Sequence, residues 1–291
     1  MLQRAISGFF FVVVMVLSIW YSSWTMALLF TGICIVALIE FHRLRVVIQP
    51  DASKSTIIIS GLFAFVITIL RAPQPIISLS NSETLLGINT FVNSVLLANI
   101  LSGGLILFLV IRDLFETKSS YPHTATGLFA AFYIGVPFGL LFYFIINPQS
   151  ADLYSGMPLL YFFILLWTND TFAYLSGKFL GKTKLWERIS PNKTWEGFVG
   201  GALFTMIAFF IIGNQDSDLG FIKNQYWIPL VVSVFATLGD LSESLLKRQA
   251  GVKDSGNIMP GHGGVLDRFD GILLSMPALV FCFSLYLIIS Q

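Results

Sequence analysis

The sequence predicts an all-α, polytopic integral membrane protein with about nine transmembrane helices. The chain has 291 residues, of which 55% are hydrophobic and only 11% are charged. Soluble domains carry roughly 25% charged residues, and the mean hydropathy here is +0.79. This composition argues against a soluble domain and favours a chain that lies mostly within a bilayer.

Apolar runs along the chain are long enough to cross about 30 Å of hydrocarbon, which takes roughly 17–25 helical residues. The first run ends in Tyr21-Ser22-Ser23-Trp24 and lacks the small-residue pattern of a signal-peptidase site, so we interpret it as a retained span. The predicted spans begin near Ile6, Met26, Thr56, Ser94, Gly127, Met157, Phe198, Tyr226 and Ile272.

The basic residues orient these spans. When alternate loops are assigned to opposite sides, all of the 17 Lys and Arg residues except Arg71 and Lys223 fall on one side. The positive-inside rule makes that side cytoplasmic. We therefore expect a cytoplasmic N-terminus and a C-terminus on the outer side. The short termini favour a bacterial inner membrane.

Ionisable residues divide the chain into two regions. Residues 1–150 are expected to be structural transmembrane helices that also shape lipid entry, because their apolar runs hold almost no ionisable group. Residues 151–291 are expected to form a catalytic transmembrane region with cytoplasmic loops, because carboxylates within a membrane are costly and usually functional. The net charge of +1, without a basic domain, argues against nucleic acid as a partner.

Glycines four residues apart predict close contacts between helices. Gly135 with Gly139, and Gly197 with Gly201, match the G-x-x-x-G spacing. Because the chain has 24 glycines, such pairs also arise by chance.

One carboxylate and three ammonium groups follow each other at the end of the sixth run. Asp170 is expected at the cytoplasmic end of that span, before Lys178, Lys182 and Lys184. A carboxylate suits Mg²⁺ and lysines suit phosphates, the combination that phosphoryl transfer needs. The alternative is a capping or ion-paired Asp170 beside lysines that only orient the chain.

A compact polar turn, Ser190 to Gly197, precedes the seventh run. Lys193, Thr194 and Glu196 present charge and hydroxyl groups there, and Pro191 favours a turn. We interpret the turn as a phosphate contact, and Trp195 as an interfacial anchor.

Four polar residues share one face of the next predicted helix. Asp240, Glu243, Ser244 and Lys247 follow spacings of three and four residues. A solvated helix end is the alternative explanation. We favour a metal- or substrate-facing role for Asp240, and leave both interpretations open for Glu243.

The loop before the last run combines glycines with paired carboxylates. The glycines of Gly261-His262-Gly263-Gly264 allow the backbone to approach phosphates. Asp267 and Asp270 stand three residues apart, so both can face one cation at a helix start, where nearby anions are also favoured. N-capping explains one of the two carboxylates but not both.

The pattern S-x-x-K-R-x4-K-D-x6-G-H-G-G-x2-D-R-x-D, from Ser244 to Asp270, closely resembles the signature of phosphatidate cytidylyltransferases. The segments around Asp170 and from Ser190 to Gly197 resemble other motifs of that family. The resemblance covers about Met157 to Ser290, and the N-terminal spans agree only in length and hydropathy.

The resemblance implies transfer of a cytidylyl group from CTP to phosphatidic acid, giving CDP-diacylglycerol and pyrophosphate. It implies carboxylates for Mg²⁺, with one or two cations bound, at Asp170, Asp240, Asp267 and Asp270. It implies catalytic roles for Lys247, Arg248, Lys253, Asp254, His262 and Arg268. It implies substrate contacts at Lys182, Ser190, Asn192, Lys193, Thr194, Ser244, Gly263 and Gly264.

The expected partners are CTP, phosphatidic acid, the lipid bilayer and a second copy of the chain in a homodimer, with the active site facing the cytoplasm. A cytidylyltransferase acting on an isoprenoid-based lipid phosphate is the nearest alternative. A transporter or channel is disfavoured because the polar residues stop at the cytoplasmic side. A CDP-alcohol phosphotransferase is disfavoured because its D-G-x2-A-R motif is absent.

Overall fold

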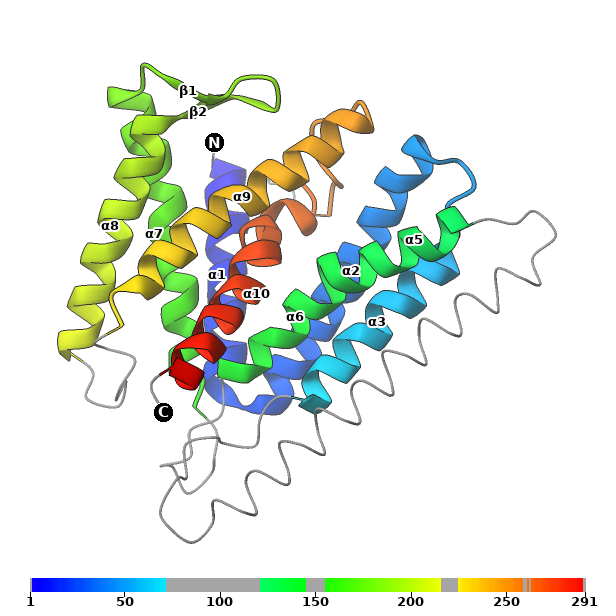
Figure 1. Cartoon of the computed structure of the whole chain (residues 1–291), viewed down its shortest axis with the longest axis horizontal. Coiled ribbons are helices and arrows are strands. Elements are labelled where there is room, and N and C mark those ends of the chain that lie inside the picture. The colour runs from blue at the N-terminus through cyan, green and yellow to red at the C-terminus, as the bar shows by residue number, and fades with distance from the viewer. Residues whose placement is uncertain are drawn as a thin grey trace, which may run out of the picture. The chain divides into compact units, whose positions relative to one another are not determined.

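The structure, a computed structural model, describes residues 2–71, 121–144, 155–215, 225–258, 261 and 263–289. Helices dominate these residues (Figure 1). Among them, four helical segments are long and apolar enough to cross a membrane: Ser23–Ile48, Thr124–Tyr143, Trp195–Asn214 and Trp227–Gln249. The prediction of a helical, polytopic membrane protein is therefore confirmed in its coarse form.

The predicted runs coincide with helices wherever the structure describes them, and the run from Ser94 lies outside the described residues. The all-α prediction did not include one element, a short antiparallel hairpin. Its strands are β1 (Lys184–Trp186) and β2 (Ser190–Thr194), with Lys184 opposite Thr194 and Trp186 opposite Ser190. The Nζ of Lys184 donates to the carbonyl of Pro191 at 2.6 Å across the hairpin.

The chain divides into two compact units, and the first comprises Met1–Met157 with Ser255–Leu266. Its described helices and helical turns are α1 (Leu2–Tyr21), α2 (Ser23–Ile48), α3 (Lys54–Arg71), α5 (Tyr121–Ala130), the π-helical turn η1 (Ala131–Gly135), α6 (Val136–Leu140) and the 3₁₀ turn η2 (Leu141–Phe144).

Helix α3 packs along α5, η1 and α6 (Figure 1). A Cβ at Gly135 would collide with the carbonyl oxygen of Gly61, and one at Gly139 would lie 2.9 Å from that of Phe65. The absence of side chains at both glycines lets the two helical segments approach closely. The predicted contact at this glycine pair is confirmed.

The second unit comprises Pro158–Asp254 and Asp267–Gln291. Its helices are α7 (Met157–Leu180), α8 (Trp195–Gln215), α9 (Trp227–Gln249) and α10 (Leu266–Ile289). A Cβ at Gly197 would lie 2.7 Å from the carbonyl oxygen of Ala173, and one at Gly201 would lie 2.9 Å from that of Asn169. This second predicted glycine contact, between α7 and α8, is also confirmed.

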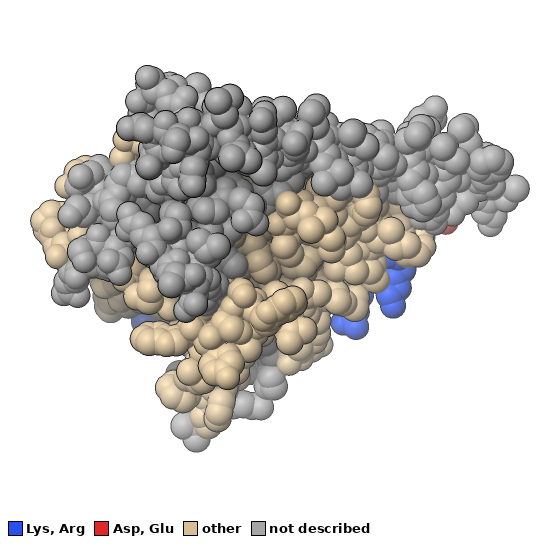
Figure 2. Space-filling view, turned by 90° about the horizontal axis from the view of Figure 1, so that it is seen from below, with Lys and Arg blue, Asp and Glu red and all other residues tan. Residues whose placement is uncertain are grey.

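Large apolar side chains remain exposed on several helices, among them Phe9, Leu17, Phe210 and Phe281. On the face that Figure 2 shows, the visible described residues are almost all uncharged. Soluble monomers rarely expose extended apolar surface, whereas a lipid-facing surface requires it. These exposed side chains fit helices that lie in a bilayer.

Candidate active site

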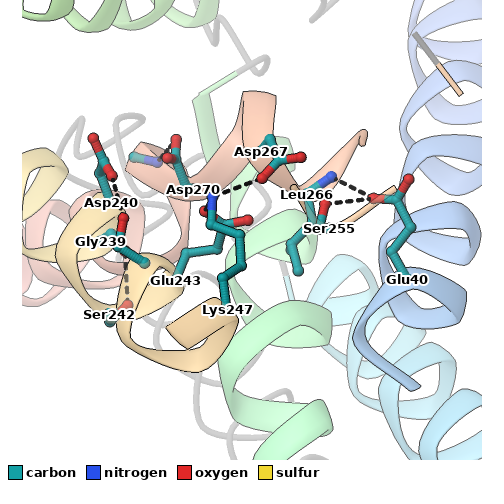
Figure 3. A network of polar contacts seen from close by, with 12 residues as sticks. Glu40, Gly239, Asp240, Ser242, Glu243, Lys247, Ser255, Leu266, Asp267 and Asp270 are labelled. Carbon is teal, nitrogen blue, oxygen red and sulfur yellow. Dashed lines mark hydrogen bonds and ion pairs between the residues drawn. The ribbon is translucent and has the colours of Figure 1, made fainter. Parts of the chain in front are cut away.

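Helices α9 and α10 cross where glycine replaces a side chain. A Cβ at Gly239 would collide with the main-chain carbonyl oxygen of Asp270. This close approach brings Asp240, the next residue of α9, near Asp270 (Figure 3). The carboxylate of Asp270 accepts a hydrogen bond of 2.7 Å from the N–H of Gly271.

Three aspartates from three helices of the second unit share one electrostatic environment. The charge of Asp270 interacts with those of Asp240 and Asp170, and also with that of Glu243. Asp170 interacts with Asp240 and with the positive charges of Lys193 and Arg268. Like charges at this proximity repel, so the cluster favours binding of a cation.

Asp240 makes the direct contacts between α9 and the hairpin. Its Oδ2 lies 2.6 Å from the Nζ of Lys193 on β2. Its Oδ1 accepts a hydrogen bond of 3.2 Å from the Oγ of Ser244, one turn further along α9. The structure thus brings together Lys193, Asp240 and Ser244, which the sequence analysis placed in two separate motifs.

Lys247 stands between two carboxylates. It pairs with Glu243 on its own helix and, at 2.7 Å, with Oδ1 of Asp267 on α10 (Figure 3). The exposed fractions of the side chains are 12% for Lys247, 7% for Asp267 and 0% for Glu243. A solvated helix end, the alternative for this face, is therefore excluded at Glu243.

Asp170 lies in the interior of α7, since that helix continues to Leu180. An N-cap role for Asp170 is excluded by this position. The helix continues past Asp170 through Gly177 to Leu180, and the place of Asp170 relative to the membrane boundary stays a prediction. The Oδ1 of Asp170 accepts a hydrogen bond of 3.5 Å from Nδ2 of Asn169. Asn169 is buried, and the sequence analysis did not predict a role for it.

The polar turn before α8 has mainly structural contacts. Thr194 is buried, and its Oγ1 accepts a hydrogen bond of 3.1 Å from the N–H of Gly197, the pattern of an N-cap. The carboxylate of Glu196 accepts from the backbone N–H groups of Lys182 and Thr183 at 3.1 Å each. Of the other predicted substrate contacts, Ser190 is half-buried and Asn192 is exposed on β2.

Several predicted residues lie at the end of α9 and in the loop after it. Arg248 is exposed in the last turn of α9, and Lys253 and Asp254 are exposed beyond it. Arg268 is exposed in the first turn of α10. His262 lies outside the described residues.

The remaining predicted glycines belong to the first unit. Gly263 has a φ of 87°, a left-handed conformation that glycine adopts without strain. Gly264 is buried, and a Cβ there would lie 2.6 Å from Oε2 of Glu40. Glu40 was missed by the sequence analysis, although it is an acidic residue within an apolar run, which is a signal for function.

The donor set suits a hard cation. Carboxylate oxygens are preferred ligands of Mg²⁺, which commonly uses one or two of them together with waters and substrate phosphates. Within the described ranges, no group of three or more His, Cys, Asp or Glu side chains is arranged to hold a metal ion by itself.

These features define a helical membrane protein whose second unit gathers carboxylates and basic groups around the crossing of α9 and α10. The chain belongs to the cytidylyltransferase family, whose model matches residues 2–286. The family resemblance found in the motifs is thus confirmed.

Relatives in three bacteria are similar to this chain. A phosphatidate cytidylyltransferase of Bacillus subtilis (strain 168) is 40% identical over 184 residues, 62% of this chain and 66% of the relative. One of Staphylococcus aureus (strain COL) is 41% identical over 173 residues, 56% of this chain and 60% of the relative. One of Staphylococcus saprophyticus is 39% identical over 195 residues, 65% of this chain and 70% of the relative. The similarity therefore spans less than two thirds of the first two relatives.

Proposed function

We propose that this protein is a phosphatidate cytidylyltransferase, which uses CTP and phosphatidic acid to make CDP-diacylglycerol and pyrophosphate. The observation that carries the proposal is the cluster of Asp170, Asp240 and Asp270 beside Lys193, in a chain of the cytidylyltransferase family. The relatives named above support the choice of phosphatidate as the lipid.

The reaction needs charge stabilisation more than it needs a strong base. A phosphate oxygen of phosphatidate attacks the α-phosphorus of CTP and forms a new P–O bond. The bond from that phosphorus to the bridging oxygen of the β-phosphate breaks, and pyrophosphate leaves with the electron pair. The second pKa of a phosphomonoester is about 6, so the attacking oxygen is already largely ionised at neutral pH.

The carboxylates are proposed to hold Mg²⁺ with the triphosphate of CTP. Asp170, Asp240 and Asp270 are the proposed ligands, and Asp267 interacts with Glu243 of the same acidic region while it pairs with Lys247. When bound, Mg²⁺ neutralises phosphate charge during the displacement. A second cation is compatible with a cluster in which Asp270 interacts with three other carboxylates.

The basic side chains are proposed to bind and orient the phosphates. Lys193 and Arg268 interact electrostatically with Asp170, which places positive charge beside the proposed metal ligands. Arg248 and Lys253 are exposed, so they are available to a substrate that arrives from water. Lys247 is engaged by Glu243 and Asp267, and we propose that it orders the start of α10.

The proposed topology has nine spans, a cytoplasmic N-terminus and an active site that faces the cytoplasm of a bacterium. CTP then arrives from water, and phosphatidate arrives laterally with its acyl chains in the bilayer. The asymmetry of the basic residues supports this orientation. A cysteine introduced at position 253 tests it: labelling by a membrane-impermeant reagent only from outside the cell would overturn the orientation.

The proposed assembly is a homodimer, which rests on the family resemblance. The molar mass of the protein in detergent or in nanodiscs, measured by light scattering with correction for bound lipid, tests this proposal. A mass of one chain of 32.3 kDa would overturn it, and twice that mass supports it.

The activity is tested by pyrophosphate release from the purified protein with CTP and Mg²⁺. We expect release that requires phosphatidate, and its loss by at least about 100-fold in Asp240→Asn, because the charged ligand is removed. Asp51→Asn, an exposed aspartate between α2 and α3, is the matched control. Release with an isoprenoid-based lipid phosphate but not with phosphatidate would move the assignment to the alternative substrate.

A further inference from the structure

Glu40 is a fully buried carboxylate on α2, with 0% of its surface exposed. An ionised carboxylate in an apolar interior is strongly unfavourable unless hydrogen bonds or opposite charges compensate it. The predicted division of the chain gave the N-terminal helices a structural role and left no function for this group.

Three described residues of the segment Ser255–Leu266 donate hydrogen bonds to Glu40. The N–H of Val265 donates to Oε1 at 3.0 Å. The N–H of Leu266 and the Oγ of Ser255 donate to Oε2 at 2.8 Å and 3.2 Å (Figure 3). One carboxylate therefore joins the beginning of this segment to its end.

Two glycines make room for the carboxylate. A Cβ at Gly256 would collide with Oε1 of Glu40, and one at Gly264 would collide with Oγ of Ser255. The buried carboxylate thus lies directly against the backbone of the segment. Gly264 was predicted as a substrate contact. Its lack of a side chain is already required by packing against Ser255 and Glu40.

The hydrogen bonds end where α10 begins. Leu266 is the first residue of α10, so Glu40 accepts from one of the N–H groups that have no partner within a helix. A negative charge at this end of a helix is also electrostatically favourable. Asp267 is the next residue of α10 after Leu266, and Arg268 and Asp270 follow it in the same helix.

We infer that Glu40 is a positioning residue: it joins Ser255 to Val265 and Leu266, and so fixes the first residue of the helix that carries Asp267, Arg268 and Asp270. The contact lies within the first unit, and the peptide bond from Leu266 to Asp267 links it to the second unit. The expected effect on turnover rests on the proposed function, whereas the anchoring of the segment does not.

The test uses the full chain in nanodiscs and measures amide hydrogen exchange without substrate. In Glu40→Gln the amide nitrogen cannot accept a hydrogen bond, so one of the two backbone donors loses its acceptor. We expect the amide that loses its acceptor, that of Val265 or that of Leu266, to exchange about 10- to 100-fold faster, the range for loss of a hydrogen bond to a charged group. Unchanged exchange in residues 255–266 would overturn the inference.

Leu38→Ala is the matched control, because Leu38 is equally buried on α2 and packs against α3 at Gly61. It is expected to lower thermal stability without faster exchange in residues 255–266. Equal acceleration of that segment in Leu38→Ala would show a general loss of stability and overturn the specific role of Glu40.

Two further variants keep the test decisive if Glu40→Gln does not fold. Ser255→Ala removes one donor and leaves both backbone donors in place, so a smaller acceleration confined to the same segment is expected. Glu40→Asp retains the charge, and we expect it to restore part of the protection. If residues 255–266 of Ser255→Ala exchanged their amide hydrogens at the wild-type rate, the inferred anchoring by Glu40 would be contradicted.

Turnover is measured separately with CTP, Mg²⁺ and phosphatidate. Glu40→Gln is expected to lower kcat at least about tenfold at a temperature where it and Leu38→Ala are both folded, and Leu38→Ala is expected to keep its kcat. If the wild-type protein transfers no cytidylyl group while the exchange results are as expected, the proposed function fails and the anchoring stands.

Discussion

The Nζ of Lys247 lies 2.7 Å from Oδ1 of Asp267 and also pairs with Glu243, so one ammonium group joins α9 to the first turn of α10. Both carboxylates are buried. The start of α10 is therefore tied to α9 by charge, in the same turn that carries the predicted metal ligands.

Loss of the Lys247 charge should be strongly destabilising. Lys247→Met leaves two buried carboxylates without their partner, and breaking a buried pair in this way costs about 3–5 kcal/mol. Unfolding of the detergent-solubilised protein by heat or denaturant measures the change. Arg188→Ala, an exposed arginine in the hairpin, is the control and should change stability by less than about 0.5 kcal/mol.

Neutralising the partners of Lys247 should recover part of that loss. In the triple variant with Lys247→Met, Glu243→Gln and Asp267→Asn, no ionised carboxylate of this trio is left unpaired, so the unfolding free energy should rise above that of Lys247→Met alone. A triple variant less stable than the single one would contradict the assignment of this cost to unpaired charge.

Gly239→Ala should separate α9 from α10. The added Cβ would collide with the carbonyl oxygen of Asp270, and overpacking of this kind costs about 1–3 kcal/mol. We also expect lower cytidylyl transfer, because the substitution displaces Asp240 from Asp270. Gly32→Ala is the control, since a Cβ at Gly32 meets nothing within 4 Å; it should be neutral or stabilising, as alanine favours helix.

Lys193→Gln should impair substrate binding more than folding. The pair with Asp240 is partly exposed, and exposed ion pairs contribute about 0–1 kcal/mol to stability. We expect the KM for CTP to rise about tenfold or more, with the melting temperature nearly unchanged. Lys184→Gln on the neighbouring strand is the control, and an equal rise in its KM would remove the special role of Lys193.

Thr194→Ala should destabilise the start of α8. It removes the Oγ1 that accepts from the N–H of Gly197, and loss of an N-cap costs about 1 kcal/mol. Thr194→Ser keeps the hydroxyl and should retain most of the stability. A fall in CTP affinity in both variants, with unchanged melting temperatures, would instead favour the predicted substrate contact.

The helices were predictable from sequence because apolar run length is a local property. The runs near Ile6, Met157 and Phe198 coincide with α1, α7 and α8. The shared face of Asp240 and Ser244 was predictable for the same reason, since side chains four residues apart in a helix are neighbours. The hairpin was missed because its strands are short and lie between charged and turn-forming residues.

The sequence predicted which residues share a site but not how they pair. Spacing and motif resemblance predicted Lys193, Asp240 and Asp267 as site residues, but not that Lys193 pairs with Asp240 while Asp267 pairs with Lys247. Those partnerships depend on which elements pack together. The sequence predicted Asp170 at the cytoplasmic end of a span, and the structure adds that α7 continues beyond it to Leu180.

By itself, the sequence determined that this chain is a helical membrane protein, because hydropathy is read along the chain. The placement of its chemistry in the C-terminal region stays a prediction from motif spacing. Only the tertiary structure decided the partners of Glu40, whose donors Val265 and Leu266 lie more than 200 residues away in the sequence. It also decided the crossing at Gly239, where Asp270 approaches a backbone without a side chain. Both contacts arise from packing between distant segments, and the satisfaction of a buried charge is a property of the folded chain.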